Sequence, residues 1–101
     1  MEINISARHF EVPEILFSLI EKKKRKFEKF KNLILDFHLS LSKDSLYFVS
    51  EGKIKLKTGI INAKVQNPEL GLAVNETLNK LLTQLKKHHE KLIEKSAKKR
   101  G

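Results

Sequence analysis

The sequence contains no cysteine, only two prolines, and four glycines that each stand alone, at positions 52, 59, 71 and 101. Without cysteine there is no disulfide bond, no thiolate nucleophile and no cysteine-based zinc site, which is typical of cytosolic proteins. Isolated glycines exclude a glycine-rich phosphate loop. No apolar run approaches the roughly 20 residues that cross a membrane. Residues 1–5 alternate polar and apolar positions and lack the pattern of a signal peptide.

Acidic residues are also scarce: 12 Asp and Glu face 21 Lys and Arg, so the net charge is +9. Residues 22–31 hold seven Lys/Arg and one Glu, and residues 80–101 hold eight and two. Each segment is therefore +6, and the rest of the chain is about −3. Charge concentrated in this way favours a polyanionic partner, nucleic acid first and an anionic membrane surface second. The alternative is that both segments are ordinary solvated helix faces.

The first third of the chain predicts a short strand and a helix. Residues 4–6 form the strand, with Ile3 and Ile5 on one face, and it breaks at residues 7–9. Pro13 and Glu14 suit a helix start, and the helix continues to about residue 31. Lys23 and Lys24 interrupt its stripe, and we expect their stems to lie along the sheet. The apolar stripe is Ile15, Leu16, Leu19, Ile20, Phe27 and Phe30.

Alternating apolar and polar residues then predict three strands, and a helical period returns after them. Turns are expected at residues 42–45 and 58–59, and the third of these strands ends at residues 67–68. The final helix runs from residue 70 to about residue 95. The inward positions are Leu33, Leu35, Phe37, Leu39 and Leu41, then Phe48, Ser50, Gly52, Ile54 and Leu56, then Ile61, Ala63 and Val65, and on the helix Val74, Leu78, Leu81, Leu85 and Leu92.

These elements predict an α+β fold of order β-α-β-β-β-α, a two-layer sandwich with a four-stranded sheet. Both helices must cover the same sheet face, because only one face is strongly apolar. A right-handed first crossover makes the first two strands parallel if they are adjacent. Residues 1–95 are expected to form a single domain, and residues 96–101 a basic flexible tail.

The candidate binding residues are the cations of the two helices. Helical spacing puts members of each set on neighbouring turns, and helices lying side by side would join them into one ridge. Binding of phosphates by such a ridge would weaken strongly with salt. The sets are Lys22, Arg25, Lys26 and Lys29 on the first helix, and Lys80, Lys86, Lys87 and Lys91 on the second.

Little in the sequence indicates catalysis or metal binding. The histidines at positions 9, 38, 88 and 89 are read as polar or RNA-facing surface, since adjacent helical histidines make poor partners for one ion. The serines lack a nucleophile elbow, and Asp36, Asp44 and Glu51 are scattered. The six phenylalanines fit core or near-core positions and only Tyr47 faces outward, which disfavours base stacking. We expect no enzyme activity, metal, cofactor or small-molecule substrate.

Three segments resemble a known family, the ribosome hibernation-promoting factors, which include the ribosome-associated inhibitor called protein Y. Residues 4–12 (NISARHFEV) are similar to its opening N-I-x-G-R-H-x-E-V. Residues 26–30 (KFEKF) are similar to K-L-E-K-Y, and residues 80–92 (KLLTQLKKHHEKL) to its closing K-L-x-x-Q-L-x-K-x-K-x-K. The order and spacing of these segments carry the resemblance. Strand order and loop placement also agree from end to end, so the resemblance extends over essentially the whole chain.

The resemblance implies the same fold and a function. A member binds 16S rRNA in the decoding channel of the 30S subunit and of the 70S ribosome, over the A and P sites. It blocks tRNA and mRNA there, and so inhibits translation during stress or stationary phase in the bacterial cytoplasm. A monomer is expected off the ribosome. The contact positions carried over are Arg8, Lys26, Lys29, Lys80, Lys87 and Lys91.

The chain departs from the family pattern at four positions. Gly71 stands where a tyrosine is usual, Thr83 where an arginine is frequent, Ala7 for a glycine and Lys23 for a core leucine. Its length and basic ending are those of a short form. Three other functions remain open. They are a protein-interaction module of the sigma-54 modulation type, a general RNA-backbone-binding domain and, ranked last, a peripheral membrane protein.

Overall fold

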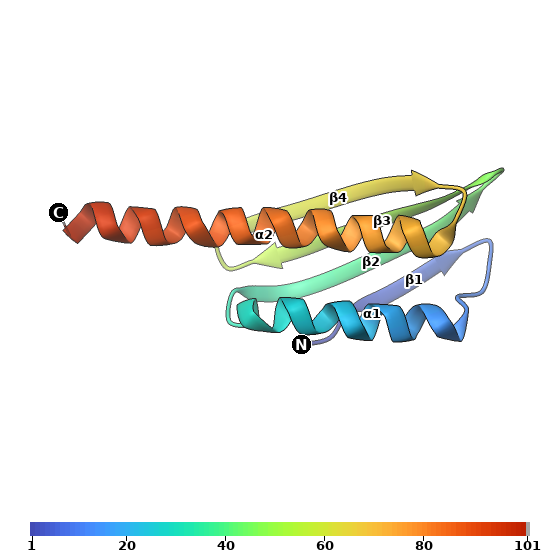
Figure 1. The fold of residues 1–101 in the computed structure, drawn as a ribbon, viewed down its shortest axis with the longest axis horizontal. Coiled ribbons are helices and arrows are strands. Elements are labelled where there is room, and N and C mark those ends of the chain that lie inside the picture. The colour runs from blue at the N-terminus through green and yellow to red at the C-terminus, as the bar shows by residue number, and fades with distance from the viewer. Residues whose placement is uncertain (101) are drawn as a thin grey trace.

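Four strands and two helices form a two-layer sandwich (Figure 1). The computed structural model describes the backbone of residues 1–100 and the side chains of residues 1–90. Both helices lie on one face of the sheet and start at the same end of it. The elements are β1 (Asn4–Arg8), α1 (Glu14–Phe27), a short 3-10 helix η1 (Glu28–Phe30), β2 (Ile34–Asp44), β3 (Tyr47–Leu56), β4 (Gly59–Asn67) and α2 (Leu70–Arg100).

The strand order is β1-β2-β3-β4. β1 runs parallel to β2, with Asn4 opposite His38, and the β2–β3 and β3–β4 pairs are antiparallel. Parallel neighbours need a crossover connection, and α1 supplies it. The predicted fold class and the parallel first pair are therefore confirmed.

The core lies between the sheet and the helices. Along β3, Ser50, Gly52, Ile54 and Leu56 are buried and the residues between them are exposed, as the period-two pattern predicted. β4 alternates in the same way. The remaining buried apolar side chains are Phe37, Leu39 and Leu41 from β2, Leu16, Ile20 and Phe27 from α1, Phe30 from η1, and Ala73, Val74, Leu78, Leu81, Leu82 and Leu85 from α2.

α2 comes closest to the sheet at Gly52 of β3. A Cβ atom at this position would overlap Leu81 Cδ1 and lie 3.2 Å from Thr77 Cγ2. Next to it, the buried Thr77 hydroxyl donates to the Ala73 carbonyl at 2.8 Å and to the Ser50 carbonyl of β3 at 3.2 Å. The absence of a side chain at Gly52 thus lets α2 pack closely against β3. The hydrogen bond from Thr77 fixes the position of α2 along that strand.

Three predicted core positions are wrong. Leu35 is 56% exposed, because the β2–β3 register shifts between Ile34 and Asp36 and turns Leu35 away from the core. Ile15 is 80% exposed in the first turn of α1, where the two helices leave a groove between them. Phe17 is 45% exposed, since it lies about 100° around the helix from the buried Leu16.

Three predicted boundaries also shift. β1 continues to Arg8 and stops at His9, whose φ is 70°. β2 continues to Asp44, so the turn is Ser45–Leu46 and not residues 42–45. α2 extends to Arg100, past the expected end near residue 95. The division into a domain at 1–95 and a flexible tail at 96–101 stays a prediction, and Leu92 lies outside the described side chains.

Candidate nucleic-acid interface

The two basic segments lie side by side in the helix layer. Lys23 Nζ of α1 donates a hydrogen bond of 2.8 Å to Asn79 Oδ1 of α2. About two to three turns further along, the Phe30 ring of η1 meets the His89 ring of α2 edge to face, with centroids 5.5 Å apart. Because these contacts advance in the same direction on both elements, the residue 22–31 segment runs alongside α2 from about residue 79 onward.

The candidate cations of α1 all reach solvent: Lys22, Arg25, Lys26 and Lys29 are exposed. Within residues 1–90, none of these four lies within 4 Å of a carboxylate, whereas Lys24 is 4.0 Å from Glu21. Lys23 is half-buried between the helices and not along the sheet as predicted. This burial, and then the Lys26 ammonium, lower the pKa of Lys23. Positive charge here is therefore concentrated enough that neighbouring ammonium groups repel each other.

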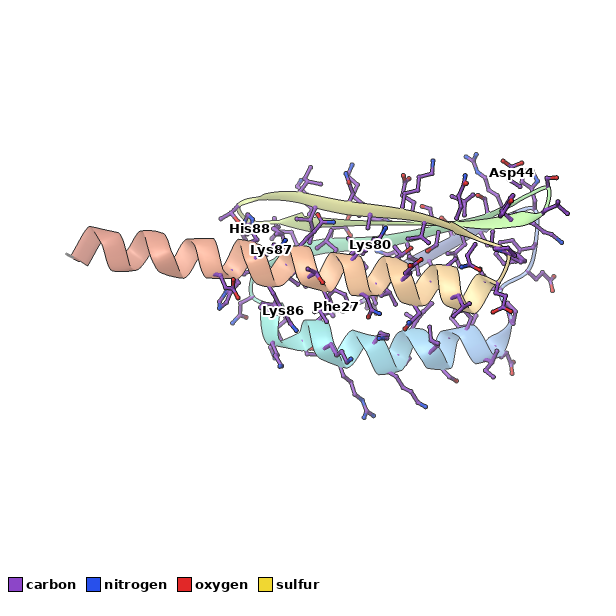
Figure 2. The ribbon with its side chains drawn as sticks, turned by 45° about the horizontal axis from the view of Figure 1, so that its top comes forward. Phe27, Asp44, Lys80, Lys86, Lys87 and His88 are labelled. Carbon is purple, nitrogen blue, oxygen red and sulfur yellow. The ribbon has the colours of Figure 1, made fainter. Side chains whose placement is uncertain are left out.

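The candidate cations of α2 lie on two flanks of the helix. Figure 2 shows Lys80 and Lys87 on the side toward β4 and Lys86 on the side toward α1. All three are exposed. Lys86 thus adjoins the α1 cations, while Lys80 and Lys87 form a separate row, so the predicted single ridge is corrected to two rows. The side chain of Lys91 lies outside the described residues.

Between the two rows, Thr83 is exposed and its hydroxyl donates to the Asn79 carbonyl at 3.0 Å. Glu76 shares a shallow hollow with Lys80 and Thr83. Sequence reasoning did not single out this carboxylate, although its spacing of four from Lys80 on a helix would have placed the two together. Glu76 lowers the positive charge at the start of the Lys80 row.

Arg8 is not part of the helix surface. It lines a hollow of about 340 Å³ on the open face of the sheet, with Ser6, Ser40, Glu51 and Lys64 among its neighbours. The sheet separates this hollow from the helices. Further exposed cations on the open face, which the sequence reasoning did not single out, are Lys53 and Lys55 of β3. Their alternation with the buried Ile54 was the signal that could have found them.

The histidines are spread over separate places. His38 Nε2 of β2 lies 2.9 Å from Asp36 Oδ2, and both side chains are exposed. His88 is hydrogen-bonded to Thr58 of the β3–β4 turn. His89 packs on Phe30. Among the described residues, no group of three or more His, Asp or Glu side chains is placed to hold a metal ion. Asp44 ends β2 and Glu51 lies in the Arg8 hollow, so these acids do not meet.

No helix in the described part of the chain is both long enough and apolar enough to span a membrane.

Comparison with solved structures identifies the same fold. A ribosomal subunit interface protein from Coxiella burnetii superposes with a TM-score of 0.80 at 24% identity, over 89% of this chain and 99% of that one. The N-terminal domain of Thermus thermophilus Protein Y gives 0.72 at 21% identity, over 85% and 94%. At these identities the likeness concerns the fold alone.

Sequence relatives extend over nearly the whole chain. The ribosome hibernation promoting factor of Escherichia coli (strain K12) is 26% identical over 92 residues, which are 91% of this chain and 97% of the relative. The factor of the same name from Pseudomonas putida (strain KT2440) is 28% identical over 91 residues, 90% and 89% of the two chains. The family described as Sigma 54 modulation protein / S30EA ribosomal protein matches residues 3–93. The chain therefore belongs to this family, that of the ribosome hibernation promoting factors.

Proposed function

We propose that this protein is a cytoplasmic bacterial ribosome hibernation factor. It binds 16S rRNA in the decoding channel of the small subunit, in 30S and 70S particles. There it blocks tRNA and mRNA at the A and P sites and inhibits translation during stress or stationary phase. The observation that carries the proposal is the juxtaposition of the basic parts of α1 and α2. Lys23 is bonded to Asn79, and the exposed candidate cations within residues 1–90 are Lys22, Arg25, Lys26, Lys29, Lys80, Lys86 and Lys87.

The chemistry of this surface suits an RNA backbone. Exposed lysines neutralise phosphates without reading sequence, and they release counterions as they do so. Of the six phenylalanines, Phe27, Phe30 and Phe37 are buried in the core and cannot stack on bases. Relatives named for ribosome hibernation support the ribosome as the source of the RNA. In this proposal the contacts are Lys22, Arg25, Lys26, Lys29, Lys80, Lys86, Lys87 and Lys91 on the helices, with Arg8 reaching RNA from the open sheet face.

The test is sucrose-gradient co-sedimentation with bacterial 30S and 70S particles across a salt series. We expect saturable comigration that weakens with salt and is competed by tRNA. In Lys80→Glu with Lys87→Glu, binding near 0.1 M salt should weaken by roughly 100-fold, and the salt slope should fall by about two.

The matched control is Lys53→Glu with Lys55→Glu, which makes the same charge change on the open sheet face outside the Arg8 hollow. This pair should leave affinity within about threefold, since only nonlocal attraction is lost. An equal loss of affinity in both variants would mean that α2 contributes only through the net charge of the protein. Full binding by the α2 variant would overturn its assignment as the RNA contact.

A further inference from the structure

An apolar groove opens between the starting turns of α1 and α2, away from the Lys86 and Lys87 end of the helix layer. It has a volume of about 450 Å³ and is lined by Ile15, Leu16, Ser18, Leu19, Lys22, Lys23 and Gly71. Apolar side chains thus form most of its walls. We call it the Ile15–Gly71 groove.

The groove exists because the helices do not close against each other at this end. Gly71 has no side chain, and a Cβ atom placed there would meet no atom within 4 Å. Opposite it, Ile15 is 80% exposed, and Leu72, next to Gly71 in the chain, is 52% exposed. A large exposed apolar side chain on the wall of an unfilled hollow is an arrangement that soluble proteins use to hold a partner.

The charges of the lining identify the kind of partner. Lys22 and Lys23 are the charged residues of the groove, and no carboxylate lines it. The ammonium of Lys23 is bonded to an uncharged amide oxygen, that of Asn79, and Lys26 is close enough to lower the pKa of Lys23. A carboxylate placed at this end would relieve that repulsion, whereas a second copy of a chain with a net charge of +9 would add to it.

The shape of the Ile15–Gly71 groove further restricts the kind of partner that it can bind. From Ile15 to Lys22 the α1 wall follows helical spacing, with Ser18 and Leu19 between them, over a length of about 10 Å. Two helices that run alongside each other present the ridges against which a third amphipathic helix packs. Nucleic acid is a poor occupant, because the apolar walls offer nothing to a phosphate backbone.

We propose that the Ile15–Gly71 groove is a docking site for an acidic amphipathic helix of another protein. The apolar side chains of that helix would fill the space beside Gly71, and its carboxylates would pair with Lys22 and Lys23. This second activity lies away from the proposed rRNA contacts Lys80, Lys86 and Lys87, and it shares only Lys22 with the proposed rRNA surface.

The probe is a synthetic acidic amphipathic peptide of about 16 residues, with leucines at helical spacing and glutamates between them. It is titrated into the ¹⁵N-labelled full chain, and amide shifts are followed by NMR. We expect saturable shifts centred on residues 15–23 and 70–72. Gly71→Leu, which fills the groove from open space, and Ile15→Ser should each weaken binding at least tenfold. Ile60→Ser, at another exposed isoleucine on β4, should leave it unchanged.

Two further measurements separate the possible failures. A peptide with lysine in place of glutamate should not bind. If a scrambled acidic peptide binds equally well, or if the amide shifts centre on Lys80 and Lys87, binding is nonspecific electrostatic attraction and the proposal is overturned. The absence of any saturable shift would overturn it too. Gly71→Leu should still co-sediment with ribosomes, so loss of peptide binding and loss of ribosome binding are distinguished in the same variant.

Discussion

The two helices cover the same sheet face but are held on it very differently. α2 buries Val74, Leu78, Leu81 and Leu85 completely, and Thr77 binds it to a carbonyl of β3. α1 buries fewer side chains, leaves Ile15 exposed, and meets α2 at Lys23 through a hydrogen bond between polar side chains. One basic segment therefore stands on a tightly packed support and the other on a looser one.

This difference bears on how each helix presents its cations. A side chain on a rigid element keeps its position relative to a partner, and less conformational freedom is lost when it binds. Lys80 and Lys87 have such a support in α2, whereas the cations of α1 follow a helix with a looser attachment. If the helices bind RNA as proposed, we expect α2 to make the better defined phosphate contacts and α1 to make a more adaptable contribution.

The largest expected effect comes from disturbing the contact of α2 with β3. Gly52→Val forces a side chain into the space that Leu81 and Thr77 occupy. We expect the free energy of unfolding to fall by about 2–3 kcal/mol and Tm to fall by roughly 10 °C or more, measured by urea and thermal unfolding followed by circular dichroism. The control is Gly71→Ala in α2, where the added methyl group would point into open space. This variant should raise the free energy of unfolding by up to about 1 kcal/mol. Equal stability of Gly52→Val and wild type would mean that α2 is not fixed at this point.

A smaller effect separates the two buried hydroxyls under α2. Thr77→Val removes the donor to the Ser50 carbonyl and should cost about 1 kcal/mol. The Ser50 hydroxyl is buried without a hydrogen-bond partner, so Ser50→Ala should be neutral or stabilise by up to about 1 kcal/mol. Urea unfolding of both variants measures the contrast. A loss in Ser50→Ala as large as that in Thr77→Val would contradict it.

The smallest effect concerns Lys23, where the two helices meet. Its pKa is lowered from 10.5 by burial and by Lys26, so the unfolded chain binds more protons between the lowered value and 10.5. The contribution of this residue to stability is therefore unfavourable at neutral pH and improves as pH rises through that interval. Lys23→Met removes this dependence. In urea unfolding from pH 7 to 10, the stability difference between the variant and wild type should shift in favour of wild type as pH rises; a constant difference would speak against a perturbed Lys23.

Periodicity predicted the element order and most of the core, because inward positions such as Ile54 and Leu81 recur at the period of their element. The parallel first pair followed from the handedness of the crossover, on the condition that the two strands are adjacent. It failed at Leu35, where a register shift interrupts a pattern that looks continuous, and at Ile15, whose exposure depends on how far α2 reaches. The exposure of the helix lysines was predictable. The division into two rows was not deduced, and neither was the position of Arg8 across the sheet, although its alternation with Ile5 indicated that side.

Because β1 pairs in parallel with β2, the strand pairs of this sheet differ in the chain entropy that is lost when they form. The β2–β3 and β3–β4 pairs close over tight turns, Asp44 opposite Tyr47 and Leu56 opposite Gly59. The β1–β2 pair, which begins with Asn4 opposite His38, closes a loop that contains all of α1. Closing the longer loop costs about 2 kcal/mol more chain entropy than closing either turn. The β1–β2 ladder and the apolar surface that α1 buries against the sheet must offset that cost, so the loosely packed helix also contributes to whether the first strand stays attached.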